Sequence, residues 1–268
     1  MDSSIFTAQG KYLMLALDQR DSFKKLMSKE HPELVEDDEI VKNKRLILKT
    51  VSQHISGVLI DQDWGLPAYR QLDLKVPFLL PAEQTGYLEQ QEEERETQIS
   101  LWPQEIKKMG AQGTKLLVYF NPQAKTAQKQ INTAKEVLEK SHQEELPLFL
   151  EIVRYGSLST VEQCVGEFIN NGVIADVFKL EPPQDKQECA NITSLLNQTP
   201  WIILTRGIDF ELFCGKLSAA TSEGCSGFLA GRSLWQELLS LDTKEKKQEF
   251  LDRTLLQRLE TIKKIVLR

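Results

Sequence analysis

The feature of this sequence that most constrains its fold is a series of eight short apolar segments separated by longer polar segments. Each apolar segment is nearly continuous and does not alternate with polar residues, which is typical of parallel strands covered on both faces. The eight segments are Tyr12–Leu17, Gly57–Ile60, Val76–Leu80, Thr114–Phe120, Leu146–Val153, Asp176–Leu180, Trp201–Leu204 and Gly227–Ala230.

The intervening segments carry apolar residues at helical spacing. Such stripes occupy Asp37–His54, Gln123–Ser141 and Gln248–Val266, and each predicts an amphipathic helix that covers a sheet. Eight βα units favour a closed (β/α)8 TIM barrel over an open sheet, and the chain contains neither GxGxxG after its first strand nor GxxxxGK[ST]. We therefore expect one α/β domain over residues 1–268, about the usual size of such a barrel.

The composition excludes several classes of protein. A formal net charge of −6 gives no general attraction to nucleic acid or to an anionic membrane, so local cations would have to hold any anionic ligand. The four cysteines are scattered without a CxxC pair, which is typical of reduced thiols. The N-terminus does not resemble a signal peptide and the apolar runs are too short to span a membrane. We expect a cytoplasmic protein.

Four charged residues lie within or directly after the predicted strands. They are Asp18, Lys115, Glu151 and Lys179. Catalytic groups of (β/α)8 enzymes lie at the carboxyl ends of the strands, and a charge buried there is costly unless it is paired or used. One alternative is a structural ion pair, for example between Lys115 and Glu151. The other is a shared active site.

An aldolase that works through a Schiff base has a use for this set. The Schiff base requires a neutral amine, which burial in an apolar strand and a second ammonium nearby both favour. Lys179 in VFKLE meets the first condition and Lys115 can supply the second. Glu151 can then transfer protons, and Asp18 can orient the network or hold a substrate hydroxyl.

The last two predicted strands both end in small or hydroxyl residues with an arginine. The loops after strands seven and eight of (β/α)8 barrels frequently bind phosphate, so we expect an anion site here. Its candidate residues are Thr205, Arg206, Gly207, Gly231 and Arg232. The alternative is that the two arginines bind loop carbonyls or surface acids.

Nothing in the sequence predicts a metal ion or another cofactor. His31, His54 and His142 fall in helical or loop segments, and the DxD of Asp61 and Asp63 is a weak signal by itself. The charged segment Glu89–Glu96 is expected to be a solvated loop or helix start, with a lid over the substrate as the alternative.

Taken together, the strands and their polar ends resemble the tagatose 1,6-diphosphate aldolase family, which includes the similar sulfofructose-phosphate aldolases. The resemblance covers nearly the whole chain in order. It is carried by LALDQR (15–20), GVLIDQDWGLPA (57–68), AEQTGY (82–87), KLLVYF (115–120), LFLEIVRY (148–155), VFKLEPP (177–183), PWIILTRGID (200–209) and SGFLAGRSLW (226–235).

The resemblance implies a (β/α)8 fold and aldol cleavage without a metal ion. It implies that Lys179 forms the Schiff base, that Glu151 is the acid/base, and that Lys115 and Asp18 support them. Substrate contacts would include Gln19, Asp61 and the anion site. The nucleophilic product would be dihydroxyacetone phosphate, released with glyceraldehyde 3-phosphate or 3-sulfolactaldehyde.

The choice of substrate stays open because the segments point in two directions. AEQTGY is more similar to the tagatose enzymes, whereas PWIILTRGID and SGFLAGRSLW are more similar to the sulfofructose enzymes. Thr205 replaces the usual serine, and Arg206 a small residue. We expect cleavage of a sugar phosphate such as tagatose 1,6-bisphosphate. The alternatives are sulfofructose 1-phosphate, a sugar-phosphate-binding regulator without activity, and a metal-dependent aldolase. Apolar helix faces such as that of the final segment permit a homodimer or a larger homo-oligomer.

Overall fold

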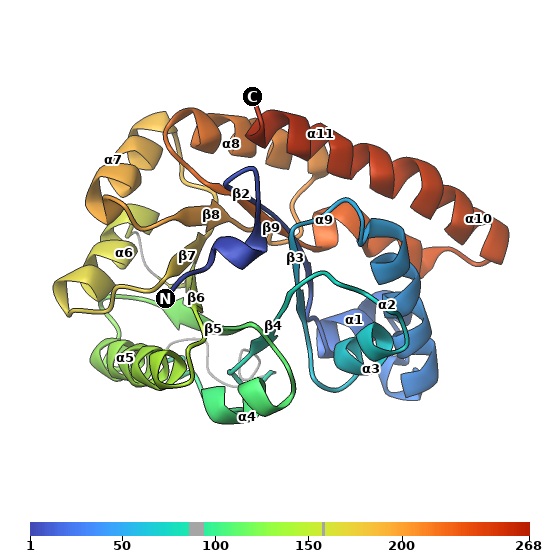
Figure 1. Cartoon of the computed structure of the whole chain (residues 1–268), viewed down its shortest axis with the longest axis horizontal. Coiled ribbons are helices and arrows are strands. Elements are labelled where there is room, and N and C mark those ends of the chain that lie inside the picture. Colours follow the sequence, from blue (N-terminus) through green and yellow to red (C-terminus); the bar gives the residue numbers. More distant parts are fainter. Residues whose placement is uncertain (86–93, 157–158) are drawn as a thin grey trace.

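The eight predicted strands form one closed parallel barrel. A computed structural model describes residues 1–85, 94–156 and 159–268. The strands follow one another around the ring in chain order, and β2 pairs with β9 to close it, as Figure 1 shows. They are β2 Lys11–Leu17, β3 Gly57–Ile60, β4 Phe78–Pro81, β5 Gly113–Phe120, β6 Leu148–Arg154, β7 Val177–Leu180, β8 Trp201–Ile203 and β9 Gly227–Ala230. The predicted (β/α)8 fold is confirmed.

Two strands begin two residues later than the sequence predicts, for a shared reason. The predicted starts at Val76 and Leu146 are each followed by a proline, and in the structure β4 and β6 begin directly after those prolines. Proline has no N–H to donate to a neighbouring strand, so the regular hydrogen-bonding pattern begins only after the proline.

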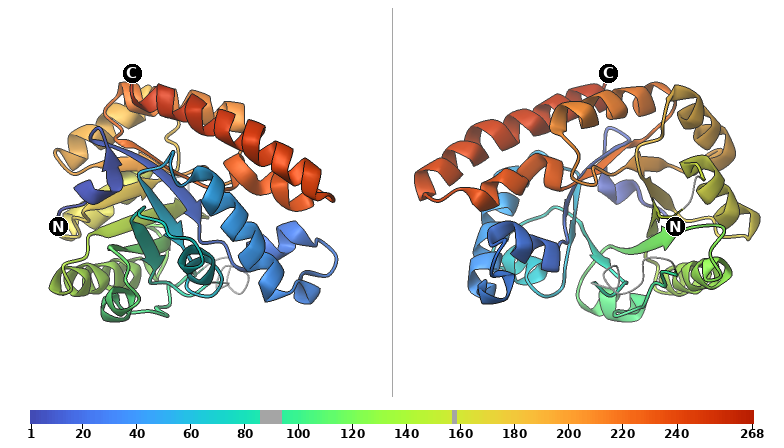
Figure 2. Two further views of the ribbon diagram at one scale, coloured as in Figure 1. Left: turned by 45° about the vertical axis from the view of Figure 1, so that its right-hand side comes forward. Right: turned by 180° about the vertical axis from the view of Figure 1, so that it is seen from behind.

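Helices surround the barrel, and each of the three stripes predicted from the sequence contains a helix, although residues 52–54 and 123–126 of the first two lie outside the helices. The helices are α1 Asp21–Met27, α2 Asp37–Val51, α3 Gly65–Arg70, α4 Pro103–Lys108, α5 Ala127–Gln143, α6 Val161–Asn170, α7 Lys186–Leu196, α8 Phe210–Ser222, α9 Arg232–Trp235, α10 Lys244–Glu249 and α11 Leu256–Val266. The final stripe is α10 and α11 joined by a π-helical turn, Phe250–Leu255. Figure 2 shows this long helix along the outside of the barrel, where α11 packs on α8.

The apolar face of that final helix is buried within the chain. Leu251, Leu255, Leu259 and Ile262 are at most 1% exposed and belong to the layer between strands and helices. This face is therefore not available to a second copy, and a homo-oligomer remains a prediction without an assigned surface.

The amino-terminal end of the barrel is closed by apolar side chains. A short 3-10 turn, η1 Ser4–Phe6, places Phe6 inside the ring, where its side chain is fully buried and packs edge-on against Phe149 at 5.3 Å between ring centroids. The two-residue strand β1 Thr7–Ala8, too short to be predicted from periodicity, then pairs antiparallel with β2. Polar side chains collect at the opposite end.

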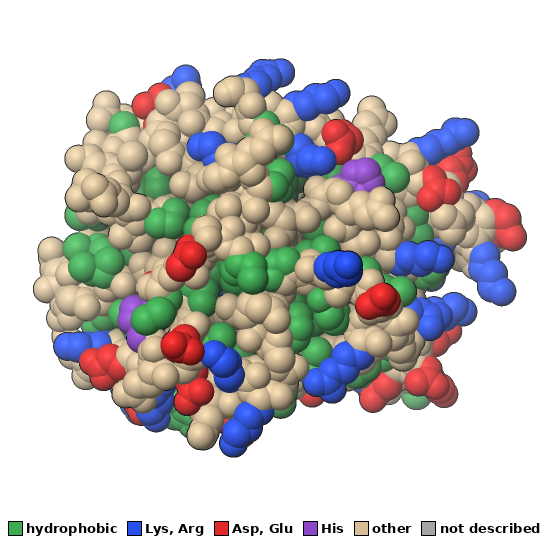
Figure 3. Space-filling model, in the orientation of Figure 1, with side chains coloured by type: hydrophobic (Ala, Val, Ile, Leu, Met, Phe, Trp, Pro, Cys, Tyr) green, Lys and Arg blue, Asp and Glu red, His purple; other side chains and the backbone are tan. Residues whose placement is uncertain are grey.

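The outer surface carries charges of both signs. On the face seen in Figure 3, basic and acidic side chains are interspersed over the outer helices. Within residues 1–85, 94–156 and 159–268, no helix combines the length and the apolar character needed to cross a membrane. Residues 89–93 of the charged segment Glu89–Glu96, and with them the predicted loop or lid, lie outside the described residues.

Candidate active site

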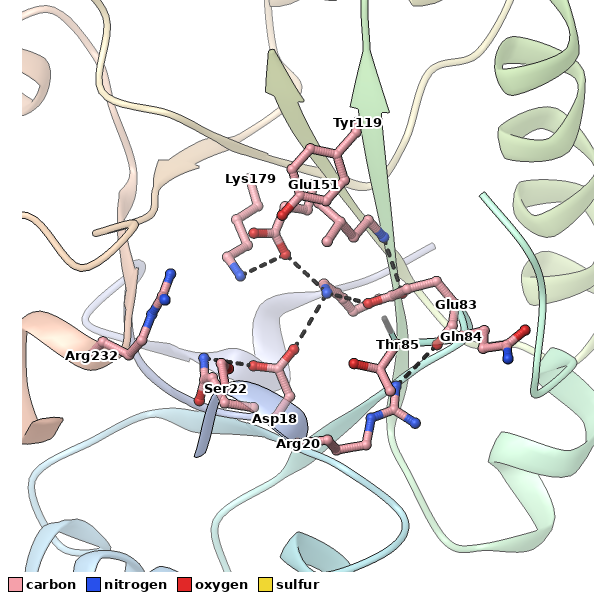
Figure 4. Close-up of a pocket in the computed structure, with 13 residues that line it drawn as sticks. Asp18, Arg20, Ser22, Glu83, Gln84, Thr85, Tyr119, Glu151, Lys179 and Arg232 are labelled. Carbon is pink, nitrogen blue, oxygen red and sulfur yellow. Dashed lines mark hydrogen bonds and ion pairs between the residues drawn. The ribbon is translucent and has the colours of Figure 1, made fainter. Parts of the chain in front are cut away.

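The four charged residues that the sequence singles out meet at the carboxyl end of the barrel. Lys115, Glu151 and Lys179 come from the neighbouring strands β5, β6 and β7, and Glu151 is the register partner of Lys179. Asp18 follows β2. The side chains of the three strand residues are buried, with 2 to 8% of their surface exposed. Figure 4 shows Asp18, Glu151 and Lys179 facing one cavity, which Lys115 also lines.

One carboxylate oxygen binds both lysines. Glu151 Oε2 lies 2.8 Å from Lys179 Nζ and 3.0 Å from Lys115 Nζ. Lys115 Nζ also lies 3.3 Å from Asp18 Oδ2 and binds Glu83 Oε1. The sequence left a Lys115–Glu151 ion pair and a shared cluster as alternatives, and the structure contains both. The amine of Lys179 faces a carboxylate as well as the expected apolar strand.

The charges within the cluster hold one another ionised. Burial alone would lower the pKa of Lys115, but Glu151, Glu83 and Asp18 raise it well above its usual value. Burial alone would raise the pKa of Glu151 and of Asp18, but Lys115 and Lys179 outweigh it, and both pKa values are lowered. At neutral pH, Lys115 is therefore a cation and Glu151 and Asp18 are carboxylates.

Glu83 is a member of this cluster that the sequence analysis missed. It lies just beyond β4, is 4% exposed, binds Lys115 through Oε1 and accepts a hydrogen bond from Leu117 N through Oε2 at 3.0 Å. Burial raises its pKa in spite of Lys115. Its position after β4 matches that of Asp18 after β2, and this was a signal that could have identified it.

The predicted anion loops also reach the cavity. Thr205 Oγ1 accepts a hydrogen bond from Gly231 N at 3.4 Å, and a Cβ at Gly231 would lie 3.2 Å from Ala16 O, which explains the glycine. Arg232 projects into the cavity (Figure 4) and donates through Nη2 to Arg206 O at 3.3 Å.

The second arginine of the predicted anion site is already paired. Arg206 and Gly207 form a left-handed turn with φ values of 51° and 80°. Arg206 Nη1 binds Glu181, which also accepts a hydrogen bond from Arg154 N at 2.7 Å. Arg206 therefore pairs with an acid, which was the alternative to an anion site, and it shares the Glu181 carboxylate with Arg154. Arg232 is left as the stronger candidate for binding an anion.

The cavity has two lobes. The larger, about 230 Å³, is lined by the cluster together with Arg20, Ser22, Gln84 and Thr85, and the smaller, about 110 Å³, by the anion loops. Both share Gln19, Tyr119, Glu151, Lys179 and Arg232. Tyr119 was not predicted as a site residue, although strand alternation places it on the face of Lys115. Burial and Glu151 raise the pKa of its hydroxyl.

Among the predicted substrate contacts, Asp61 and Gly207 line neither lobe, and Asp61 is bound elsewhere. The Asp61 side chain is 0% exposed and lines neither lobe of the cavity. It binds the amine of Lys44. Its Oδ1 accepts hydrogen bonds from Asp63 N and Trp64 N at the start of α3. Because Lys44 and these N–H groups, with that of Gly65, already occupy its carboxylate, we do not retain Asp61 as a substrate contact.

The geometry defines a (β/α)8 enzyme site with a buried amine, a carboxylate in proton-transfer contact and an arginine loop. This set can attack a carbonyl and move protons on an anionic substrate. In the part of the chain that the structure describes, no three His, Cys, Asp or Glu side chains group to hold a metal ion.

The sequence profile described as DeoC/LacD family aldolase matches residues 12–237. The chain therefore belongs to the DeoC/LacD aldolase family. Its similar proteins include tagatose 1,6-diphosphate aldolase 2 of Enterococcus faecalis, 28% identical over 270 positions that cover 86% of this chain and 80% of that protein. Tagatose 1,6-diphosphate aldolase of Lactococcus lactis subsp. lactis is 26% identical, covering 95% and 90%.

Solved structures of low sequence identity share the fold. An archaeal fructose-1,6-bisphosphate aldolase, with its catalytic lysine covalently bound to a carbinolamine intermediate, superposes with a TM-score of 0.71, 16% identity, and coverage of 98% of this chain and 97% of that one. A Schiff-base-forming fructose-1,6-bisphosphate aldolase gives a TM-score of 0.70 at 17% identity, covering 98% and 96%.

Proposed function

We propose that this protein is a class I aldolase that reversibly cleaves a ketose 1-phosphate bearing a second anionic group, with tagatose 1,6-bisphosphate preferred. The observation that carries the proposal is the contact between Lys179 Nζ and Glu151 Oε2 at 2.8 Å, inside a barrel that ends in an arginine loop. A protein that only binds a sugar phosphate has no use for a buried amine held against a carboxylate.

In this mechanism Lys179 is the nucleophile. Glu151 accepts the ammonium proton, and the neutral amine adds to the C2 carbonyl of the ketose to give a carbinolamine. Glu151 then returns the proton to the departing hydroxyl, and water leaves to form the iminium. Lys115 stays protonated because three carboxylates raise its pKa, and it keeps Glu151 ionised between proton transfers.

Cleavage follows from the iminium. Glu151 takes the proton of the C4 hydroxyl, the C3–C4 bond breaks, and its electron pair moves into the iminium to give an enamine while the aldehyde leaves. Protonation of the enamine at C3 and hydrolysis then release dihydroxyacetone phosphate and restore Lys179. Asp18 and Gln19, which line the same cavity, would orient the substrate hydroxyls.

We propose that Thr205, Gly207, Gly231 and Arg232 bind the phosphate on C1. Thr205, Gly231 and Arg232 line the smaller lobe, and a Cβ at Gly207 would lie 3.5 Å from Arg232 Nε, so its backbone runs beside that guanidinium. Arg206 would contribute only if it left Glu181. Sulfofructose 1-phosphate is the second candidate substrate because the two arginine loops are more similar to the sulfofructose enzymes, and parallel assays of both sugars separate the two.

The proposal is tested by borohydride reduction in the presence of dihydroxyacetone phosphate, followed by peptide mass mapping. We expect a reduced adduct on Lys179 in the wild type and none in Lys179→Ala. Glu151→Gln should retain some adduct while its turnover falls by about 10²- to 10⁴-fold, since it loses acid–base catalysis.

Lys216→Ala is the matched control, because Lys216 donates to Pro183 O and Gln184 O and does not line the cavity. Its adduct should equal that of the wild type. Failure of the wild type to form an adduct or to cleave either sugar would contradict the proposal and favour a regulator. Loss of activity in EDTA would instead favour a metal-dependent aldolase.

A further inference from the structure

The two lobes of the cavity meet at the reactive amine of Lys179 and at Arg232, and differ in the rest of their lining. The smaller lobe adds Thr205 and Gly231 of the β8 and β9 loops, and the larger adds Asp18, Arg20, Ser22 and Thr85. In Figure 4, Arg232 and Arg20 lie on opposite sides of Asp18. We propose that Arg20, with the hydroxyls of Ser22 and Thr85, is a second anion site that holds the phosphate or sulfonate at the far end of the substrate.

Arg20 has unused capacity to bind an anion. Its side chain is 8% exposed, yet its hydrogen bonds are few: Nη2 donates to Glu83 O at 3.2 Å, and Nε is buried with no hydrogen-bond partner. Its nearest carboxylate, Asp63 Oδ2, is 3.5 Å from Nη1 and belongs to a side chain that is 47% exposed. A guanidinium has five donors, and a buried charge paired this weakly is costly unless a ligand completes it.

The other charges in the larger lobe do not compete for this role. Lys115 is surrounded by Asp18, Glu83 and Glu151, and Lys179 is paired with Glu151. Among the described residues at the far end of the lobe, Arg20 is therefore the available cation. Ser22 and Thr85 add neutral donors, which suit the remaining oxygens of a tetrahedral anion.

The sizes of the lobes set the direction of the substrate. This step rests on the proposed function, in which C2 of the ketose is joined to Lys179. One arm of the sugar is then only C1 with its phosphate, and the other runs from C3 to C6. The short arm fits the lobe of about 110 Å³ beside Arg232, and the long arm fits the lobe of about 230 Å³ that Arg20 lines.

Arg20→Gln tests this assignment with three sugars: tagatose 1,6-bisphosphate, sulfofructose 1-phosphate and tagatose 1-phosphate, which has no anion at C6. For whichever of the first two the wild type cleaves, kcat/KM should fall by about 10- to 100-fold, the loss typical of one hydrogen-bonded charge. For tagatose 1-phosphate it should change by less than about threefold. Arg232→Gln should lower kcat/KM for every sugar, because all carry the C1 phosphate.

Arg70→Gln is the matched control, since Arg70 Nη2 also donates to a backbone carbonyl, that of Met109, at 3.2 Å, away from the cavity. It should change none of the three values. Trapping of dihydroxyacetone phosphate by borohydride should be equal in Arg20→Gln and the wild type. An equal loss on all three sugars in Arg20→Gln would overturn the assignment.

A second variant covers the case in which Arg20→Gln does not fold. Ser22→Asp places a carboxylate in the first turn of α1, where helices tolerate acids, and should selectively weaken cleavage of the doubly anionic sugars. A loss that is not selective overturns the assignment. If the wild type cleaves none of the sugars, the proposed function fails separately. The second anion site is then tested by calorimetric titration with inorganic phosphate in the Arg232→Gln background, which removes the first anion site. Phosphate binding that is lost when Arg20→Gln is added supports the second site, and absence of phosphate binding overturns it.

Discussion

At the scale of single residues, Glu151 is the side chain on which the site depends most. Its Oε2 is the common acceptor of Lys115 and Lys179, so its loss removes the one carboxylate oxygen that both buried lysine side chains contact. Glu83, with a raised pKa, and Glu151, with a lowered one, bind the same lysine. As the pH falls, Glu83 therefore takes up its proton at a higher pH than Glu151.

The stability of the protein should reflect Glu151 in acid. The pKa of Glu151 in the folded state is below its ordinary value of 4.5, so its contribution to the free energy of unfolding is present above about pH 4.5 and is lost as the pH falls through the folded-state pKa. Asp18 adds to this with the same sign below its ordinary value of 3.8.

We expect Glu151→Gln to lower the free energy of unfolding at pH 7 by about 3 kcal/mol, because it breaks a buried ion pair. The variant should therefore unfold at a lower temperature than the wild type. The difference in stability between the two proteins should narrow as the pH is lowered from 6 to 3. Over this range the wild type loses the stabilisation by ionised Glu151, which the variant does not have. Thermal unfolding followed by circular dichroism at each pH measures this. A difference that stays constant down to pH 3 would show that Glu151 has no lowered pKa.

At the scale of elements, a buried lysine on α2 fixes the end of β2. Lys44 Nζ donates to Leu17 O at 3.0 Å and to Gln19 O at 2.8 Å, and binds Asp61 on the β3–α3 turn. The two carbonyls flank Asp18. Burial lowers the pKa of Lys44 in spite of Asp61. Asp61 thus affects the active site indirectly: it binds Lys44, and Lys44 holds the segment that carries Asp18 and Gln19.

Lys44→Met should therefore affect both folding and activity. It leaves Asp61 buried without its cation, and we expect a loss of about 3 to 5 kcal/mol in urea unfolding. Displacement of Asp18 by about 1 Å should lower kcat by about 100-fold. Adding Asp61→Asn to Lys44→Met should restore part of the stability but not kcat, because the two carbonyls remain unbound.

The control for Lys44→Met is Asp176→Asn at the amino-terminal end of the barrel. Asp176 also has a buried side chain, and it accepts hydrogen bonds from Leu148 N at 2.7 Å and from His142 at 2.9 Å. Asp176→Asn should lower stability and leave kcat unchanged. An unchanged kcat in Lys44→Met as well would show that this lysine supports the fold and does not position the active site.

At the scale of the whole molecule, the periodicity of the sequence predicted the architecture well and the side-chain partners less well. Near-continuous apolar runs define buried parallel strands, so the barrel and the meeting of Lys115, Glu151 and Lys179 followed from strand order alone. Partners that depend on where a chain turns were not predictable in this way. Asp61 paired with Lys44, Arg206 paired with Glu181, and Glu83 joined Lys115 from outside any predicted strand.

The two ends of the barrel should separate stability from activity. Phe6 closes the amino-terminal end, where a Cβ at Gly57 would lie 2.8 Å from its ring and one at Gly113 would lie 3.2 Å from it, so these glycines admit the ring. Phe6→Ala should lower the free energy of unfolding by about 3 to 5 kcal/mol through the cavity it leaves, and Phe6→Leu by less. Because the reacting groups lie at the opposite end, kcat at 25 °C should stay within about twofold of the wild type in both variants. Urea unfolding and steady-state assays measure the two quantities, and a fall in kcat that parallels the loss of stability would show that the apolar end and the active site are coupled.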